Sequence, residues 1–351
     1  MLSLKTRILL AVGIIATIFA GILDFEHGNA VLSFVVAGVA LAMLAAIVGD
    51  ATEQLGTHLG PAATGVLQSA IGNLPELFVG IFALRAGLLD VVQAALVGSI
   101  LGNSLLVLGL AFLVGGLRNG TQRFAKEQPR VIATLTLLAV SALVVPTLAQ
   151  KLHTPAGSHA ETLSIACAIV LLVVFVASIP FSVSGGAVAV EDEEEKGQGW
   201  PLWLAITLLV LAGVGSAFVS DWFVAALGPA IKVLHISQAF TGLVIVAIAG
   251  NAVENVVGIQ LAARNKPDFA ISVILNSSLQ VALALTPALV LLSFVVGTTH
   301  LTLVLPPLLV AALGLTTALS AIIVYDGESI WLEGVALLGL YGIIAASFWW
   351  G

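Results

Sequence analysis

Long apolar stretches alternate with short polar segments along almost the whole chain. Eleven of these stretches are long enough for the roughly 20 residues of helix that cross a bilayer. They lie near residues 7–23, 30–55, 61–86, 90–116, 130–149, 161–184, 200–226, 237–263, 268–294, 301–324 and 331–350. The pattern predicts an all-α polytopic membrane protein with about eleven transmembrane helices. Lys5 and Arg7 precede the first stretch, but no small-residue cleavage site follows it, which favours a transmembrane helix over a signal peptide.

The composition agrees with a protein embedded in lipid. Of the 351 residues, 60% are hydrophobic and only 9% are charged, whereas soluble domains carry about 25% charged residues. Cys167 is the single cysteine, so the chain can form neither an internal disulfide nor a thiolate metal site. The net charge of -7 indicates little about partners, because the five acids at 191–195 supply much of it. A lipid bilayer is the expected surrounding, and no nucleic-acid partner is expected.

Positive charges in the alternating loops predict the orientation. With the N-terminus inside, nine Lys and Arg residues fall on the inner side and three on the outer side. The inner set is Lys5, Arg7, Arg118, Arg123, Lys126, Arg130, Lys196, Arg264 and Lys266, and the outer set is Arg85, Lys151 and Lys232. Because cytoplasmic loops carry the excess of positive charge, we expect a cytoplasmic N-terminus and a C-terminus on the opposite side.

A constant offset of 178 residues superposes two halves of the chain. The offset matches Gly72, Asn73 and Glu76 with Gly250, Asn251 and Glu254. The same ungapped shift matches Val79-Gly80-Ile81 with Val257-Gly258-Ile259, Asp90 with Asp268, Ser99 with Ser277, and Leu101 with Leu279. Polar matches of this kind are informative in so apolar a sequence, and they indicate an internal repeat. Since five helices is an odd number, the second copy enters the membrane from the opposite side, which is the arrangement of an inverted-repeat transporter.

The predicted organisation is one N-terminal helix followed by two inverted repeats of five helices. The N-terminal helix occupies residues 1–25, the first repeat 30–184 and the second repeat 200–351. Residues 185–199 between them form an acidic linker on the cytoplasmic side. Its carboxylates act either as a solvated tether that stays out of the membrane or as a low-affinity cation sensor that regulates transport.

Glu76 and Glu254 place one carboxylate inside an apolar stretch of each copy. An ionisable residue at membrane depth is costly and marks an ion or proton pathway by default. On a helix, Asn73 shares a face with Glu76, and Asn251 shares a face with Glu254. Pro75 lacks a backbone N–H, and the neighbouring glycines weaken the helix, so bare carbonyl groups become available as ligands. Further oxygen donors on the following helices are Ser99, Asn103, Asn276, Ser277 and Gln280.

A shell made only of oxygen atoms, with two carboxylates, suits a hard divalent cation. Ca2+ accepts about 6–8 flexible oxygen ligands, whereas Mg2+ gives up its water reluctantly. The sequence holds no cluster of His or Cys that would indicate zinc or copper. Two ionised glutamates balance one Ca2+, and two protons neutralise the same pair. Because carboxylates in a low-dielectric site protonate near neutral pH, the sequence predicts Ca2+ as the transported substrate, H+ as the coupling ion, and no enzymatic activity.

These features resemble the calcium/cation antiporter superfamily and, within it, the cation/proton (Ca2+/H+) exchangers. The resemblance rests on Gly-Asn-x-x-Glu in both halves, on segments 98–103, 277–280 and 326–334, and on the acidic linker. It implies a 1+5+5 arrangement, alternating access around a midplane site, and Glu76 and Glu254 as shared Ca2+ and H+ ligands. Asn255 stands where this branch commonly has His, which puts in doubt any gating or proton-relay role of that position. Pro75 replaces a small or aliphatic residue, so the two half-sites need not be equivalent.

Other functions remain open at this point. The Na+/Ca2+ exchanger branch would favour an extra acid near Gln280, and its absence favours H+ as the coupling ion. Asp50 and Asp221 suggest an intramembrane aspartyl protease, which needs two carboxylates sharing a proton but leaves the repeat unexplained. A passive cation channel usually forms its pore from several subunits or filter rings. The two glutamates could also cap helices or form interhelical hydrogen bonds in a protonated state.

Overall fold

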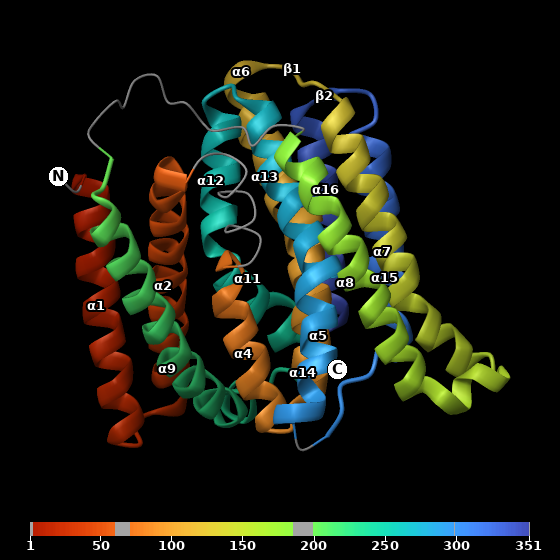
Figure 1. Ribbon diagram of the computed structural model, residues 1–351, viewed down its shortest axis with the longest axis horizontal. Helices are drawn as coiled ribbons and strands as arrows, with labels where there is room; N and C mark the ends of the chain where they lie inside the picture. The colour runs from red at the N-terminus through yellow and green to blue at the C-terminus, as the bar shows by residue number, and fades with distance from the viewer. Residues whose placement is uncertain (1–2, 60–70, 185–198, 298, 351) are drawn as a thin grey trace. The chain divides into compact units, whose positions relative to one another are not determined.

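The computed structural model describes residues 3–59, 71–184, 199–297 and 299–350, and these are helical apart from loops and one short pair of strands (Figure 1). Each of the eleven predicted apolar segments contains a helix or a continuous series of helices. Residues 60–70 of the third segment, and residues 185–198 of the predicted linker, lie outside the described residues. Within the described residues, each predicted segment therefore contains helix, although several helices begin or end at other residues than the predicted ones.

The helices pack into two compact units. Unit 1 comprises Met1–Ala86, Ala177–His235 and Ala249–Val253, and unit 2 comprises Gly87–Val176, Ile236–Ile248 and Glu254–Gly351. Each unit contains elements from both halves of the sequence. The two compact units therefore do not coincide with the two predicted repeats.

Unit 1 is built around three long helices. They are α1 (Leu4–Phe25), α2 (Ala30–Leu59) and α9 (Leu202–Leu234), and α2 packs along both of the others (Figure 1). The rings of Phe34 and Phe223 stack between α2 and α9 with centroids 4.8 Å apart. The shorter α4 (Leu74–Arg85) packs against α9. Most of the apolar side chains of α1 are exposed, which suits a helix that faces lipid.

Unit 2 contains the remaining elements and the larger core. In chain order they are α5 (Leu89–Leu101), η1 (Gly102–Val107), α6 (Leu108–Asn119), β1 (Gln122–Arg123), α7 (Glu127–Lys151), η2 (Pro155–His159), most of α8 (Ala160–Ser184), α10 (Gln238–Phe240), η3 (Thr241–Val246), the start of α11 (Ala247–Gly250), most of α12 (Ala252–Ala263), α13 (Pro267–Gln280), η4 (Val281–Leu285), α14 (Thr286–Val296), α15 (Pro307–Ile323), β2 (Glu328–Ser329) and α16 (Trp331–Ser347). Fully buried side chains such as Ile100, Leu105, Phe112 and Ile271 form its interior.

Three π-helical segments interrupt the long helices of the described chain. They are η1, η3 and η4. Under the 178-residue offset, Gly102–Val107 corresponds to residues 280–285, so η1 and η4 occupy equivalent positions in the two copies. A π segment is rare and is frequently found at functional sites.

Seven helical spans of the described chain are long and apolar enough to cross a membrane. They are Thr6–Phe25, Ala30–His58, Leu89–Asn119, Glu127–Lys151, Pro155–Ile179, Leu202–Leu234 and Pro267–Val296. Gln238–Gly250 and Glu254–Ala263 form an eighth candidate, bent by 65° at a break, and α15 and α16 are apolar but shorter. These spans agree with a multi-pass membrane protein, whereas the full count of eleven crossings stays a prediction.

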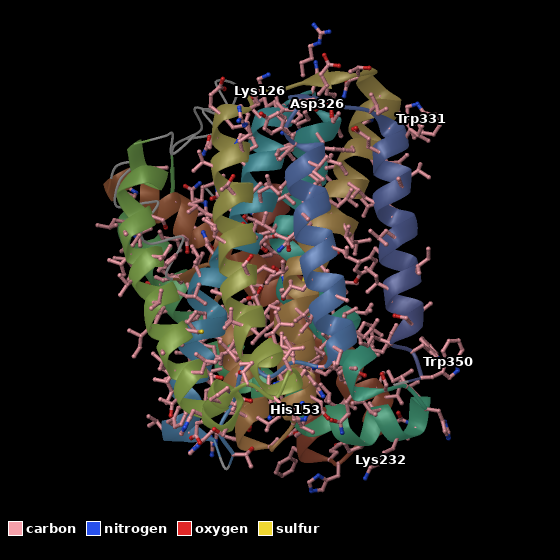
Figure 2. All side chains as sticks on the ribbon, turned by 90° about the vertical axis from the view of Figure 1, so that its right-hand side faces the viewer. Lys126, His153, Lys232, Asp326, Trp331 and Trp350 are labelled. Atoms are coloured by element: carbon pink, nitrogen blue, oxygen red, sulfur yellow. The ribbon has the colours of Figure 1, made fainter. Side chains whose placement is uncertain are left out.

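A short ribbon closes one end of unit 2. Strand β1 pairs with β2 in antiparallel fashion, with Gln122 opposite Ser329 and Arg123 opposite Glu328. An ion pair of 3.1 Å joins Arg123 Nε to Glu328 Oε1. Lys126 lies at this end of the unit, and His153 lies near the other end (Figure 2). Because α7 spans the residues between these two, it connects the two ends of the unit.

Candidate cation site

Glu76 lies in the first turn of α4. The helix begins at Leu74, Asn73 occupies its N-cap position with φ −93° and ψ 22°, and Pro75 stands within the first turn. A proline there breaks no intrahelical hydrogen bond, because the first N–H groups of a helix have no partner in the helix. Asn73 and Glu76 therefore stand at the start of a helix, whereas the sequence suggested one continuous helix face. The positive end of the helix dipole favours a carboxylate in this turn.

The backbone of Gly250 gives the Glu76 side chain its space within unit 1. A Cβ atom added to Gly250 would lie 2.6 Å from Cγ and 3.1 Å from Oε1 of Glu76. Such distances are shorter than real contacts, so Glu76 packs directly on this glycine. Glu76 and Asn73 are each 8% exposed, and Asn251, which follows Gly250, is 3% exposed. Unit 1 thus brings the glutamate of the first copy onto the Gly-Asn pair of the second.

Glu254 repeats this arrangement at the start of α12. It lies in the first turn of that helix and is partly buried. Both α4 and α12 are 12 residues long, and α12 follows the 65° bend. A broken helix at membrane depth is tolerated where its exposed backbone groups line a cavity or an ion site. The two repeat-equivalent glutamates therefore share the same local setting, the N-terminal turn of a short helix.

A second group of predicted residues lies inside unit 2. Asn103 Nδ2 donates a hydrogen bond of 2.8 Å to Ser277 Oγ. Next to it, the hydroxyls of Ser104 and Ser278 lie 3.2 Å apart. All four side chains are at most 5% exposed. This pair of contacts joins η1 to α13 through buried polar groups.

Ser99 and Gln280 complete the predicted set on the same helices. Ser99 lies near the end of α5 and is 4% exposed, and Gln280 is the last residue of α13 and is partly buried. The sequence did not single out Ser104, although its position beside Asn103 was a signal. Ser278 was noted only as a neighbour of Ser277, and the structure shows its side chain among the buried polar contacts.

Two glycines let α5 and η3 touch through their backbones beside Ser99. A Cβ atom at Gly98 would lie 2.2 Å from the carbonyl oxygen of Leu243, and one at Gly242 would lie 2.4 Å from that of Val91. Small residues allow this close approach of helices in membranes. Because the obstructing atoms are backbone, no side-chain rotation can relieve the contact. The backbone of α5 next to Ser99 therefore lies directly against the backbone of η3.

The donors assembled in each unit are carboxylate, amide and hydroxyl oxygens. Among the described residues, no group of three or more His, Cys, Asp and Glu side chains could hold a metal ion. This donor chemistry suits a hard cation that binds and leaves more than a soft, permanently held metal. Asp221, one of the two acids of the protease hypothesis, is exposed on α9, which does not suit a buried catalytic dyad.

Comparison with known proteins agrees with this chemistry. The family model described as sodium/calcium exchanger protein matches residues 29–184 and 204–350. A Ca2+/H+ antiporter of Aphanothece halophytica is 34% identical, with 95% of this chain and 96% of that protein covered. The Ca2+/H+ antiporter ChaA of Bacillus subtilis is 35% identical, with 97% of both chains covered.

Solved structures show the same fold. The structure of native YfkE matches with a TM-score of 0.83 at 31% identity, covering 97% of this chain and 99% of that one. The H+/Ca2+ exchanger CAX matches in fold with a TM-score of 0.76 at 18% identity, covering 98% and 92%. The family model covers most of the chain in two segments, and the similarity extends over nearly the full length. The chain therefore belongs to the sodium/calcium exchanger protein family.

Proposed function

We propose that this protein exchanges Ca2+ for H+ across a membrane by alternating access. Relatives named Ca2+/H+ antiporter, which match over at least 95% of the chain, support this assignment. The observation that carries it is the pair of repeat-equivalent glutamates, each in the first turn of a short helix. The positive end of the helix dipole favours an ionised carboxylate in the first turn, and an ionised carboxylate is a ligand that Ca2+ prefers.

In this proposal, Glu76 and Glu254 are shared by Ca2+ and protons. Two carboxylates compensate the charge of one Ca2+, and two protons replace it without leaving net charge at membrane depth. Neutral oxygen donors complete the Ca2+ shell, and they come from Asn73, Asn251, Ser99, Asn103, Ser277 and Gln280. Their support is the repeat and their burial, since most of them are at most 8% exposed. Competition of two protons with one divalent ion then couples the two fluxes.

The same proposal includes eleven transmembrane helices in a 1+5+5 arrangement. Its support is the coincidence of all eleven apolar segments with helices. The excess of Lys and Arg in alternate loops supports a cytoplasmic N-terminus and a C-terminus on the other side. The acidic linker at 185–199 then lies on the cytoplasmic side, between repeats at 30–184 and 200–351.

Uptake of 45Ca2+ into proteoliposomes with an imposed pH gradient tests the assignment. Wild-type protein should accumulate Ca2+ in response to the gradient, and Glu76→Gln and Glu254→Gln should each lower uptake to the level of protein-free liposomes. Glu127→Gln, which changes an exposed glutamate at the start of α7, is the matched control and should transport normally. Unchanged uptake in both site variants would overturn the site.

Changing the gradient separates the other functions. Uptake that follows a Na+ gradient and ignores a pH gradient would place the protein with Na+/Ca2+ exchangers. Ca2+ flux without obligatory counterflow would identify a channel. Exchange of internal for external Ca2+ that saturates with concentration supports the carrier mechanism.

A further inference from the structure

Residues 300–305, which join α14 to α15, are tied to four helices by side chains; we call them the latch segment. Its alternate leucines, Leu301, Leu303 and Leu305, are 1%, 3% and 6% exposed. The segment has neither helical nor sheet structure. Buried backbone groups nevertheless require hydrogen-bond partners. Side chains of the surrounding helices must therefore supply them.

Three buried hydroxyls accept hydrogen bonds from the N–H groups of these leucines. Ser293 of α14 binds Leu301 at 2.9 Å, Ser164 of α8 binds Leu303 at 2.9 Å, and Thr147 of α7 binds Leu305 at 2.8 Å. The three hydroxyl residues are at most 2% exposed. Thr147 also donates to the carbonyl of Leu303 at 2.9 Å. The latch segment is thus held in one register against three helices.

Gln93 fastens the latch segment to α5. Its Nε2 donates to the carbonyl oxygens of Thr302 at 3.0 Å and Val304 at 3.1 Å. Gln93 precedes Ser99 on the same helix by six residues, a rise of about 9 Å. A small, mostly apolar cavity lined by Gln93, Thr286 and the latch leucines leaves local room for movement. A change in the latch segment therefore reaches the helix that carries a candidate ligand.

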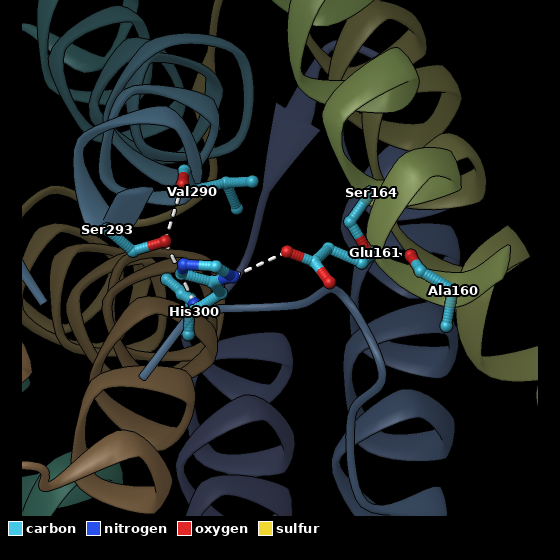
Figure 3. Close-up of polar contacts among 7 residues, drawn as sticks. Ala160, Glu161, Ser164, Val290, Ser293 and His300 are labelled. Atoms are coloured by element: carbon cyan, nitrogen blue, oxygen red, sulfur yellow. Dashed lines mark hydrogen bonds and ion pairs between the residues drawn. The ribbon is translucent and has the colours of Figure 1, made fainter. Parts of the chain in front are cut away.

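His300 is the titratable group at the start of the latch segment. Its Nδ1 lies 2.5 Å from Glu161 Oε1 (Figure 3). The centroid of its ring lies 4.2 Å from that of Phe294. Glu161 stands one turn before Ser164 on α8, and Phe294 follows Ser293 on α14. His300 is therefore held by the same two helices that bind the N–H groups of Leu301 and Leu303.

The contact between His300 and Glu161 changes strength with pH. A histidine carries a positive charge only when it is protonated, so the contact is an ion pair when His300 is protonated and a weaker neutral hydrogen bond when it is not. The exposed titratable or charged groups on the elements around it are Lys151 at the end of α7, the following His153, His159 of η2, Asp90 of α5, and Glu127 and Arg130 at the start of α7. Cys167 of α8 is partly buried. The described residues of α14 and α15 contain no titratable side chain. Glu161 is thus the charged group that responds to His300.

We propose that residues 300–305 form a proton-responsive latch on the exchange of Ca2+, with His300 and Glu161 as a regulatory proton site separate from the two glutamates. Protonated His300 pairs with Glu161, tightens the latch segment on Gln93, and slows the movement of α5 during transport. Gln93 is a positioning residue in this mechanism. The inference rests on the proposed function, because it concerns the rate of that transport.

Exchange of 45Ca2+ for unlabelled Ca2+ in proteoliposomes, with equal pH on both sides, tests the latch without a proton driving force. Saturating Ca2+ removes competition by protons at the transport site. Wild-type exchange should be about two- to fivefold faster at pH 8 than at pH 6, the range expected for one exposed ion pair. In His300→Gln and Glu161→Gln, the exchange rates at pH 8 and at pH 6 should be equal. The same result is expected for Gln93→Leu. His153→Gln is the matched control and should keep the wild-type ratio.

Hydrogen exchange of the full-length protein in detergent gives a second readout. After correction for intrinsic rates, peptides covering residues 299–306 should be better protected at pH 6 than at pH 8 in the wild type and equally protected in His300→Gln. A wild-type pH ratio in both His300→Gln and Glu161→Gln would overturn the latch. Absence of any Ca2+ exchange by the wild type would instead overturn the proposed function, while hydrogen exchange would still test the latch.

Discussion

Residues 89–119 and 267–296, which correspond under the 178-residue offset, have the same order of helical elements but differ in side chains. In the first copy α5 leads through η1 into α6, and in the second α13 leads through η4 into α14. Both turn into π-helix at equivalent positions. The first copy has Gly98, Gly102 and Asn103 where the second has Asn276, Gln280 and Val281. The repeat therefore preserves shape more closely than chemistry.

This difference makes the polar contacts between the copies one-sided. Asn103 donates to Ser277, but the equivalent pair would join Val281 to Ser99, and a valine side chain cannot donate. Gly98 is a second difference. It allows backbone contact with Leu243, whereas the equivalent residue of the second copy is Asn276. A site shared by two copies need not have two equal halves.

Gly98→Ala should have the largest effect of the changes that probe this comparison. The new Cβ would meet backbone atoms of Leu243 at 2.2 and 2.5 Å, and overpacking of this kind costs about 2–3 kcal/mol when the backbone must shift. We expect thermal unfolding in detergent at a clearly lower temperature and loss of most Ca2+ uptake. Gly102→Ala, one turn further along, has open space around its Cβ and is the control. Equal behaviour of the two variants would show that the close helix contact is absent.

Gly250→Ala should have the next largest effect, on ion affinity. The added methyl group displaces the Glu76 side chain, which packs on Gly250. We expect the KM for Ca2+ to rise about tenfold, equivalent to about 1.4 kcal/mol. Gly72→Ala changes the repeat-equivalent glycine. A similar rise in both variants would indicate equal half-sites, and a rise confined to Gly250→Ala would sharpen the asymmetry. A wild-type KM for Gly250→Ala would remove the glycine from the site.

A double-mutant cycle on Asn103 and Ser277 should show the smallest effect. Asn103→Leu and Ser277→Ala remove the two ends of one buried hydrogen bond. Their coupling in unfolding free energy should be about 0.5–1.5 kcal/mol. The equivalent cycle with Ser99→Ala and Val281→Ala should be additive within about 0.5 kcal/mol. Coupling of the same size in both cycles would contradict a one-sided contact.

The sequence predicted the helical character of the chain well because long apolar runs leave a strong pattern, and it also predicted an internal repeat. Apolar length alone located segments that each contain a helix. The match of Asn73 and Glu76 with Asn251 and Glu254 predicted the two copies, which stay a prediction. The start of α4 at Leu74 was missed, because an apolar run was read as one continuous helix. Its signals were present, since Asn at the N-cap, Pro in the first turn and Glu just after it mark a helix start.

Other features left no recognisable pattern. A π segment differs from an α-helix by its hydrogen bonds, and residues 102–107 and 281–285 share no polar motif. Thr147, Ser164 and Ser293 are single hydroxyls in apolar helices, where such residues commonly bond to the carbonyl four positions earlier. Ser164 and Ser293 do donate to carbonyls of their own helices, those of Ala160 and Val290. Only the fold shows that all three hydroxyls also accept from the latch segment. Gly98 was noted as part of a motif, but its contact with Leu243 depends on a helix distant in sequence.

The matched π segments also bear on whether this widened turn arose before or after the two copies separated. The 178-residue offset holds without a gap from Gly72 to Leu101 and continues into both π segments. An ancestor that already carried this widened turn before its gene duplicated requires one event, whereas separate origins require two at the same position. The ancestral half-length protein, paired with a second copy of itself, would then have had the same helix shape on both sides and identical residues in both halves.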